Sequence, residues 1–424
     1  MLSGSHPRTK KSQYINAVLR NPVEGLLDPE PIARKCNETV FQEGLVWHCD
    51  TVIGGIGNVG NMWLNCVRYA IEAGATTLIL PTLGVRSTED LLDLGGKDNA
   101  ISISALFDVD HFLDSWGQVC PQMRAVVSDS DIPNLPAADT SPHLAPNRVK
   151  AFRMSLHILL DPTGWREAFD VWLGKAMGPD RKLSATTPFR VWQNKVMFQW
   201  NRKAAQNSPD FNTAFARLFR YPDETRRLAA SVLWQLEHKL GRHIVPDAVL
   251  DAKTPGIANH LEPGRIEPGT YLGCHLRVAD DAVRVQWPGY DAQAPGYIAE
   301  AVSRNLSAIY LATGSKEHRE RFRQDAAASG IQVFTKEDLL EDADLEALQT
   351  LSWDQQALID FDVLIRSAYF YGFLRSSFSW AVTIRRSSLP EAGEAVRLPR
   401  DEFRDNLSAI QGRNTRINPW AVWP

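Results

Sequence analysis

Charged side chains follow directly after a short apolar stretch near the middle of the chain. Residues 271–274 predict a short buried strand, and His275, Arg277, Asp280 and Asp281 lie within the next seven residues. In an open α/β sheet, ligands bind beyond the carboxyl ends of the strands, so we expect Arg277 to face a binding cleft. Its guanidinium offers a planar fork of donors that suits a phosphate. The alternative is an ordinary ion pair between Arg277 and an aspartate at the strand end.

A glycine-rich turn in the first quarter of the chain has the spacing of a nucleotide-binding loop. Residues 55–60 satisfy the pattern GxGxxG through Gly55 and Gly57, and a predicted helix leads from them to a predicted parallel strand at 76–81. A dinucleotide site needs an acidic residue at the end of that strand to hold a ribose, and this strand ends in Pro-Thr instead. We therefore interpret the glycines as positions where the backbone approaches a ligand, with the amide of Asn58 beside them.

Two aspartates raise the question of a metal site. Asp108 and Asp110 have the spacing that suits a divalent cation bound to a nucleotide diphosphate. The apolar residues on either side of them equally predict the capped start of a helix. At this point both interpretations stay open.

Hydroxyl groups cluster near the C-terminal end of the chain. Ser376 and Ser377 lie between a predicted strand at residues 369–373 and a predicted helix that reaches residue 382. A helix N-terminus presents free N–H groups, and two hydroxyls beside them would complete a seat for a phosphate. The alternative is that one of the two serines is an ordinary helix N-cap.

The elements that must position these residues alternate between strands and helices, which predicts two Rossmann-like sheets. Helical spacing of apolar residues also predicts helices at 152–160 and 188–200. The expected divisions are an irregular lead-in (1–45), a first Rossmann-like domain (46–250) with a helical region (148–245), a linker (251–269) and a second Rossmann-like domain (270–424).

The composition argues against several classes of protein. The chain has 424 residues, of which 44% are hydrophobic, and this is enough for more than one core. A formal net charge of −4 argues against a nucleic-acid-binding surface. Five cysteines without a CxxC pair argue against a zinc site and permit at most two disulfides. No stretch is apolar for long enough to span a bilayer, and residues 1–13 lack the apolar core of a signal peptide.

Taken together, these stretches resemble the GDP-fucose O-fucosyltransferase family, in the same order, over roughly residues 50–385. Gly55, Gly57 and Asn58 resemble its first motif, although Val59 stands where a Gln is common, so any contact of that Gln is in doubt. The segment from residue 107 to 112 looks like one that is structural in the plant branch, which weakens the metal interpretation. The other matching residues are the HLR motif (His275, Arg277 with Asp281) and the C-terminal nucleotide motif (Asp360, Ser367, Ser376, Ser377, Phe378).

The resemblance implies a GT-B fold, in which two Rossmann-like domains face each other, with a helical insertion in the N-terminal half. It implies a glycosyltransferase that inverts the anomeric carbon, needs no metal or other cofactor, and transfers fucose from GDP-fucose to a protein Ser or Thr hydroxyl or to a glycan. The catalytic residues would be Arg277 and Asn58. The residues that would bind the donor are Gly55, Gly57, Asn58, His275, Arg277, Asp281, Asp360, Ser376, Ser377 and Phe378.

Each of these residues is expected to have a role in this chemistry. Without a metal, Arg277, the two serines and helix N–H groups would meet the charge of the departing diphosphate. Asp360 would accept hydrogen bonds from guanine, and Phe378 would pack on the base or the ribose. Asp281 would orient His275 or Arg277.

Other functions and locations stay open. The chain could use another sugar nucleotide, could bind a sugar nucleotide without turnover, or could be an NAD(P)-dependent oxidoreductase. We expect the lumen of the endoplasmic reticulum or Golgi, with membrane attachment only through an anchor outside this chain, and a cytoplasmic location as the alternative.

Overall fold

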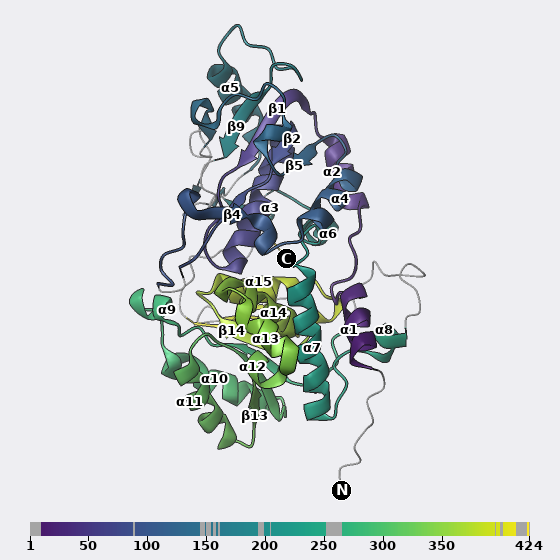
Figure 1. The fold of residues 1–424 in the computed structure, drawn as a ribbon, viewed down its shortest axis with the longest axis vertical. Helices are drawn as coiled ribbons and strands as arrows, with labels where there is room; N and C mark the ends of the chain where they lie inside the picture. The colour runs from purple at the N-terminus through teal and green to yellow at the C-terminus, as the bar shows by residue number, and fades with distance from the viewer. Residues whose placement is uncertain are drawn as a thin grey trace.

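The structure is a computed structural model, which describes residues 10–87, 90–144, 149, 154–155, 158–159, 162–193, 199–203, 205–251, 265–394, 396–398, 402–412 and 422–423. The fold is mixed α/β, and its two large sheets follow each other along the long axis of the molecule (Figure 1). We call the elements around the sheet that contains strand β1 (Gln42–Cys49) the first half, and those around the sheet that contains strand β11 (Leu272–His275) the second half.

The sheet of the first half has five parallel strands in the order β5-β2-β1-β9-β6. Helix α3 (Ile56–Ala73) connects β1 to β2 and ends at Gly74, whose φ of 68° is a left-handed conformation that glycine adopts without strain. The predicted βαβ unit is confirmed. The strands are β1 (Gln42–Cys49), β2 (Ala75–Ile79), β5 (Arg124–Val126), β6 (His143–Leu144) and β9 (Phe189–Gln193).

The sheet of the second half has seven strands in the order β13-β12-β11-β14-β17-β16-β15. Its first five strands are parallel and the last two pair antiparallel. Because β11 lies between β12 and β14, the residues that follow it stand at the middle of the carboxyl edge. The strands are β11 (Leu272–His275), β12 (Ala308–Ala312), β13 (Gln332–Phe334), β14 (Tyr369–Phe373), β15 (Val396–Leu398), β16 (Glu402–Arg404) and β17 (Ser408–Gln411).

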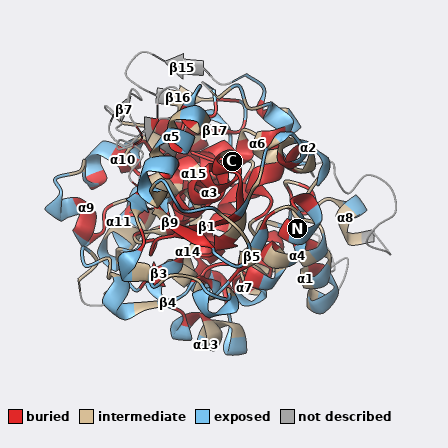
Figure 2. Ribbon diagram, turned by 90° about the horizontal axis from the view of Figure 1, so that it is seen from above, coloured by how far each residue is buried: buried red, intermediate tan, exposed pale blue. Residues whose placement is uncertain are grey.

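Helices cover both sheets, and the residues of α3 and of α15, which lie near the centre of the view in Figure 2, are largely buried. The remaining helices are α1 (Lys11–Arg20), α2 (Glu30–Glu38), α4 (Val109–Val119), α5 (Trp165–Met177), α6 (Pro209–Ala216), α7 (Asp223–Leu240), α8 (Asp247–Asp251), α9 (Asp280–Arg284), α10 (Tyr290–Ser303), α11 (Lys316–Ala327), α12 (Lys336–Leu339), α13 (Asp342–Thr350), α14 (Trp353–Ile365) and α15 (Ser377–Arg386). The short strands are β3 (Thr82–Gly84), β4 (Ala100–Ser102), β7 (Met154–Ser155), β8 (Ile158–Leu159) and β10 (Gln199–Trp200).

The prediction of an irregular lead-in over residues 1–45 is wrong in its described part. Helices α1 and α2 form there, and β1 begins at Gln42. Pro29 is the N-cap of α2 and Pro31 lies in its first turn, where the missing N–H has no helical partner to lose. The prolines therefore mark a helix start.

The predicted helix at 188–200 is also wrong, because Phe189–Gln193 forms strand β9 beside β1. Polar side chains are buried on this strand: Gln193 accepts a hydrogen bond from the Trp47 indole (3.0 Å), and Arg190 pairs with Asp129 (3.0 Å). A strand buried on both faces loses the alternation that identifies strands in a sequence. In the predicted helix at 152–160, the described residues belong to the short strands β7 and β8.

The predicted division at residues 250 and 270 does not separate the halves. Helix α7 follows the first sheet in sequence but packs on α14 and α13, and its Arg227 lies 2.6 Å from Asp344. The C-terminal Trp423 returns to the first half, where its backbone N–H donates to Asn61 (3.0 Å). Most of the predicted linker, residues 252–264, lies outside the described residues.

Two disulfides link elements of the first half. Cys36 of α2 pairs with Cys120 after α4, and Cys49 of β1 pairs with Cys66 of α3. Cys274 is a free, buried thiol in β11. No helix among the described residues is both long and apolar enough to cross a membrane.

Candidate functional site

A cleft of about 920 Å³ lies where residues of both halves meet. The first half contributes the glycine-rich turn and the loop after β3, and the second half contributes the segments that follow β11, β12, β13 and β14. Nine of the ten residues predicted to bind a donor line it, and they are Gly55, Asn58, His275, Arg277, Asp281, Asp360, Ser376, Ser377 and Phe378.

Arg277 follows β11 and is held by Asp281 of α9. Its Nη1 donates to Oδ1 of Asp281 (2.7 Å) and its Nη2 donates to Oδ2. The guanidinium and the carboxylate therefore form a bidentate ion pair. Burial opposes the ionisation of Asp281, but the hydrogen bonds and charge of Arg277 outweigh it and lower the pKa of that carboxyl. Asp281 thus orients Arg277, one of the two roles predicted for it.

His275 joins the end of β11 to the first turn of α15. The Ser379 hydroxyl accepts from the backbone N–H of Phe373 (3.0 Å), so it can donate its own proton to His275 Nδ1 (2.8 Å). Burial, together with the charge of Arg277, lowers the pKa of His275 to about 3. His275 is therefore neutral near pH 7, and its ring lies 4.5 Å from the ring of Phe378.

The start of α15 answers the question left open by the two serines. Ser376 is the N-cap, and its hydroxyl accepts from the backbone N–H of Ser379 (3.4 Å). Ser377 is the first helical residue. Both line the cleft, so the capping role of Ser376 places the helix N-terminus at the cleft wall.

Gly57 is the predicted donor-site residue that does not line the cleft. It is buried, and a β-carbon on it would lie 2.5 Å from the carbonyl oxygen of Ser377 and 2.9 Å from the backbone nitrogen of Phe378. The first turn of α3 thus packs directly on the start of α15. Glycine at this position makes room for the other half, and the prediction that Gly57 contacts the donor stays a prediction. The turn before it depends on Gly54, whose φ is 102°.

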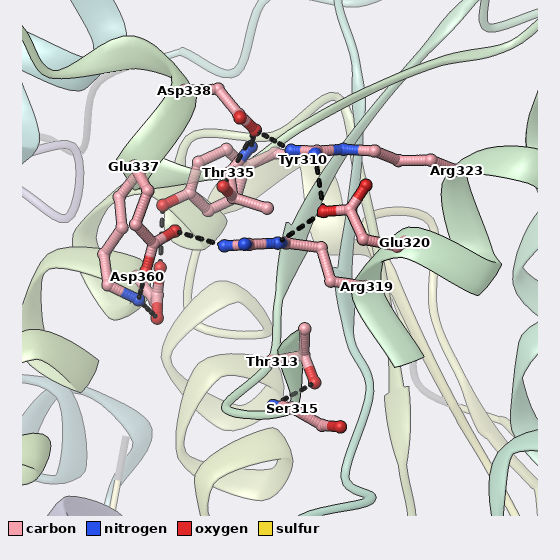
Figure 3. A network of polar contacts seen from close by, with 11 residues as sticks. Tyr310, Thr313, Ser315, Arg319, Glu320, Arg323, Thr335, Glu337, Asp338 and Asp360 are labelled. Atoms are coloured by element: carbon pink, nitrogen blue, oxygen red, sulfur yellow. Dashed lines mark hydrogen bonds and ion pairs between the residues drawn. The ribbon is translucent and has the colours of Figure 1, made fainter. Parts of the chain in front are cut away.

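Asp360 lies at the floor of the cleft in a polar network (Figure 3). Its Oδ1 accepts from the Tyr310 hydroxyl (2.7 Å) and its Oδ2 from Lys336 Nζ (2.8 Å). Burial raises the pKa of Asp360, while the charge of Lys336 opposes that shift. Glu337 continues the network, 3.5 Å from Lys336 Nζ and 3.5 Å from Arg319 Nη1. Asp360 therefore already has a partner on each oxygen.

Sequence reasoning missed several charged residues of the cleft. Lys336 and Glu337 follow β13, a predicted strand, and the rule that pointed to Arg277 at the end of β11 would have found them. Arg86 and Asp354 gave no such signal, since one stands in a loop and the other in the first turn of α14. They meet in the cleft, with Arg86 Nε 3.2 Å from Asp354 Oδ2.

Asp108 lies outside the cleft and caps α4, as one of its two interpretations predicted. Its Oδ1 accepts from the backbone N–H of His111 (2.9 Å), and its Oδ2 accepts from Arg220 Nε (2.9 Å). Among the described residues, no three His, Cys, Asp or Glu side chains are grouped so that they could hold a metal ion.

A comparison with models of protein families agrees with the resemblance. The model of the family described as GDP-fucose protein O-fucosyltransferase matches residues 46–389. Among solved structures, POFUT1 in complex with GDP-fucose is 12% identical, with a TM-score of 0.44, over 82% of this chain and 95% of that chain. A mutant FUT1 of Arabidopsis thaliana in complex with GDP is 10% identical, with a TM-score of 0.36, over 84% of this chain and 72% of that chain. The search of curated proteins gave no match.

Because the matched region spans most of the sequence, the chain belongs to the GDP-fucose protein O-fucosyltransferase family and is a fucosyltransferase, one class of glycosyltransferase.

Proposed function

We propose that the cleft binds GDP-fucose and that the protein transfers fucose, with inversion and without a metal, to a hydroxyl of a protein Ser or Thr or of a glycan. One observation carries the proposal: Arg277 and the N-terminus of α15 line the same cleft, and the hydrogen bond between His275 and Ser379 ties them together. Family membership supplies the donor and the reaction.

The parallel first sheet and the largely parallel second sheet, with a cleft between the halves that carry them, support a GT-B arrangement. Most of the lining comes from the second half, so we assign the nucleotide to that side. The first half contributes Asn58, whose exposed side chain makes it a partner for the sugar or the acceptor.

The chemistry follows from where charge develops. As the acceptor hydroxyl attacks the anomeric carbon, the bond between that carbon and the diphosphate oxygen breaks. Negative charge then grows on the departing diphosphate, and preorganised hydrogen-bond donors stabilise it best. Asp281 holds the plane of Arg277, so this guanidinium needs little rearrangement to meet the charge. The first N–H groups of α15 and the hydroxyl of Ser377 add neutral donors on the same wall.

The base of the nucleotide fits the polar floor formed by Asp360, Lys336 and Glu337. Since Tyr310 and Lys336 occupy the oxygens of Asp360, direct recognition of guanine by Asp360 requires one of these contacts to be exchanged. Glu337 has an exposed side chain and offers a second carboxylate to the ring nitrogens.

Titration calorimetry with GDP, UDP and NADH, in excess chelator, tests this function. We expect GDP to bind and to bind more tightly than UDP or NADH. Loss of GDP binding in the chelator would contradict a metal-free site. Preference for NADH would instead indicate a dinucleotide-dependent oxidoreductase.

We also propose that the protein acts in the secretory pathway. The two disulfides support this location, because they form and persist in oxidising compartments. Protein purified from the lumen without a reductant should keep both disulfides. Thiol titration should then find four additional thiols only after a reductant is added. Four thiols that react before reduction would contradict it.

A further inference from the structure

Arg86 reaches from the first half to the second across the cleft. Its Nε lies 3.2 Å from Asp354 Oδ2, and its Nη1 donates to the Leu91 carbonyl (2.5 Å) and lies 3.7 Å from Asp281 Oδ2. The Arg86 side chain is only 9% exposed. A guanidinium held at three points and this far buried has a fixed direction.

The third nitrogen of Arg86 is directed at the glycine-rich turn. Nη2 lies 3.6 Å from the position that a β-carbon on Gly55 would take, and it has no hydrogen-bond partner among the residues that the structure describes. Gly55 has a φ of −71°, which any residue adopts, so the backbone alone does not demand glycine there. The missing side chain leaves space beside Nη2 instead.

This space opens on the start of α3, an 18-residue helix with Gly55 as its N-cap. No side chain in the described part of the chain caps it, and Gly54, Gly55 and Ile56 all line the cleft. A buried guanidinium with an unused nitrogen therefore faces an uncapped helix N-terminus, and both favour an anion.

Arg277 belongs to the second half, so it supplies a cation to the donor from one side of the cleft only. Its two terminal nitrogens are paired with the two oxygens of Asp281, so each already has one partner before a donor binds. A diphosphate carries more than one negative charge and presents oxygens on more than one side. A second guanidinium from the opposite wall would match it better than Arg277 can.

We infer that Arg86 is a second diphosphate-binding residue, which contacts the donor from the first half while Arg277 contacts it from the second. This inference rests on the proposed function, because it assumes that the cleft holds a nucleoside diphosphate. Asp354 and the Leu91 carbonyl position Arg86, and Nη2 makes the contact.

The alternative role for Arg86 is purely structural, as an ion pair that joins the halves. Comparing GDP with guanosine separates the two roles, since guanosine shares the base and ribose but lacks the phosphates. In calorimetric titrations, Arg86→Met should weaken the affinity for GDP by about tenfold or more, while the affinity for guanosine changes by less than about twofold. Arg86→Lys should recover part of the loss, because the charge returns without the fork.

Arg284→Met is the matched control, because it removes another arginine–aspartate pair between the halves (Arg284 Nη1 lies 2.9 Å from Asp90 Oδ1), and neither residue of that pair lines the cleft. We expect it to leave GDP affinity within about threefold of the wild type. Equal losses of GDP affinity in Arg284→Met and Arg86→Met, or a loss of guanosine affinity that parallels the loss of GDP affinity, would overturn the assignment and leave a structural ion pair. Arg86→Met with unchanged GDP affinity would overturn it as well. A wild-type protein that binds GDP no better than guanosine would contradict the proposed function itself.

Discussion

Gly57 and Ser377 are in direct contact across the two halves of the molecule. A β-carbon on Gly57 would lie 2.5 Å from the carbonyl oxygen of Ser377, far inside van der Waals distance. The first turns of α3 and α15 therefore meet backbone to backbone, and both turns lie next to residues that line the cleft. The shape of the cleft depends on this contact.

Gly57→Ala should destabilise the protein, because the added carbon would meet rigid backbone rather than a flexible side chain. Overpacking of this kind typically costs about 1–3 kcal/mol in the free energy of unfolding. Denaturant unfolding measures it. Gly117→Ala in α4 is the control, since no atom of the described residues lies within 4 Å of its added carbon, and it should leave stability unchanged or slightly raised. Equal stability of the two variants would contradict the close approach.

Asn58→Ala should separate binding from transfer. The side chain of Asn58 is exposed in the cleft on the wall of the first half, whereas most of the lining comes from the second half. We expect GDP affinity within a few-fold of the wild type and a clear fall in fucose transfer, because one amide partner is lost. Gln118→Ala, at an exposed position of α4, controls for amide removal elsewhere. A large loss of GDP affinity in Asn58→Ala would place Asn58 in the nucleotide site instead.

The buried His275 should make stability depend on pH. Burial and Arg277 lower its pKa to about 3, below the ordinary value of 6.5, so the folded state binds fewer protons than the unfolded state between these values. The free energy of unfolding should therefore fall as the pH falls from about 6.5 towards 3, by at most about 1.4 kcal/mol per pH unit from this residue.

Comparison with His275→Gln isolates this contribution, because His48 is half-buried and its pKa is also lowered, to about 4. Denaturant unfolding at several pH values should show a shallower fall for His275→Gln than for the wild type. Parallel curves for the two proteins would mean that His275 is not kept neutral by the fold.

The sequence predicted most of the central strands and nine of the residues that line the cleft, because those signals are local. Buried apolar runs identified β11 and β14, and polar residues immediately after them pointed to the carboxyl edge of the sheet. The remaining features depend on contacts between residues far apart in the chain. Gly57 is required by its contact with Ser377, and Arg86 is held by its ion pair with Asp354. No pattern in the sequence near Gly57 or Arg86 could therefore show these roles. Strand β9 was hidden because its polar residues are buried by partners on other elements.

Turnover of GDP-fucose by the wild type and by Arg277→Ala, in excess chelator, tests the central claim most directly. We expect the wild type to release GDP and transfer fucose without added metal, and Arg277→Ala to lose turnover by ~10²–10³, about 2.7–4 kcal/mol, while its unfolding midpoint stays near that of the wild type. Arg277→Lys should recover only part of the activity, because an ammonium cannot reproduce the two-nitrogen pairing with Asp281. Near-normal turnover by a folded Arg277→Ala protein would contradict the account.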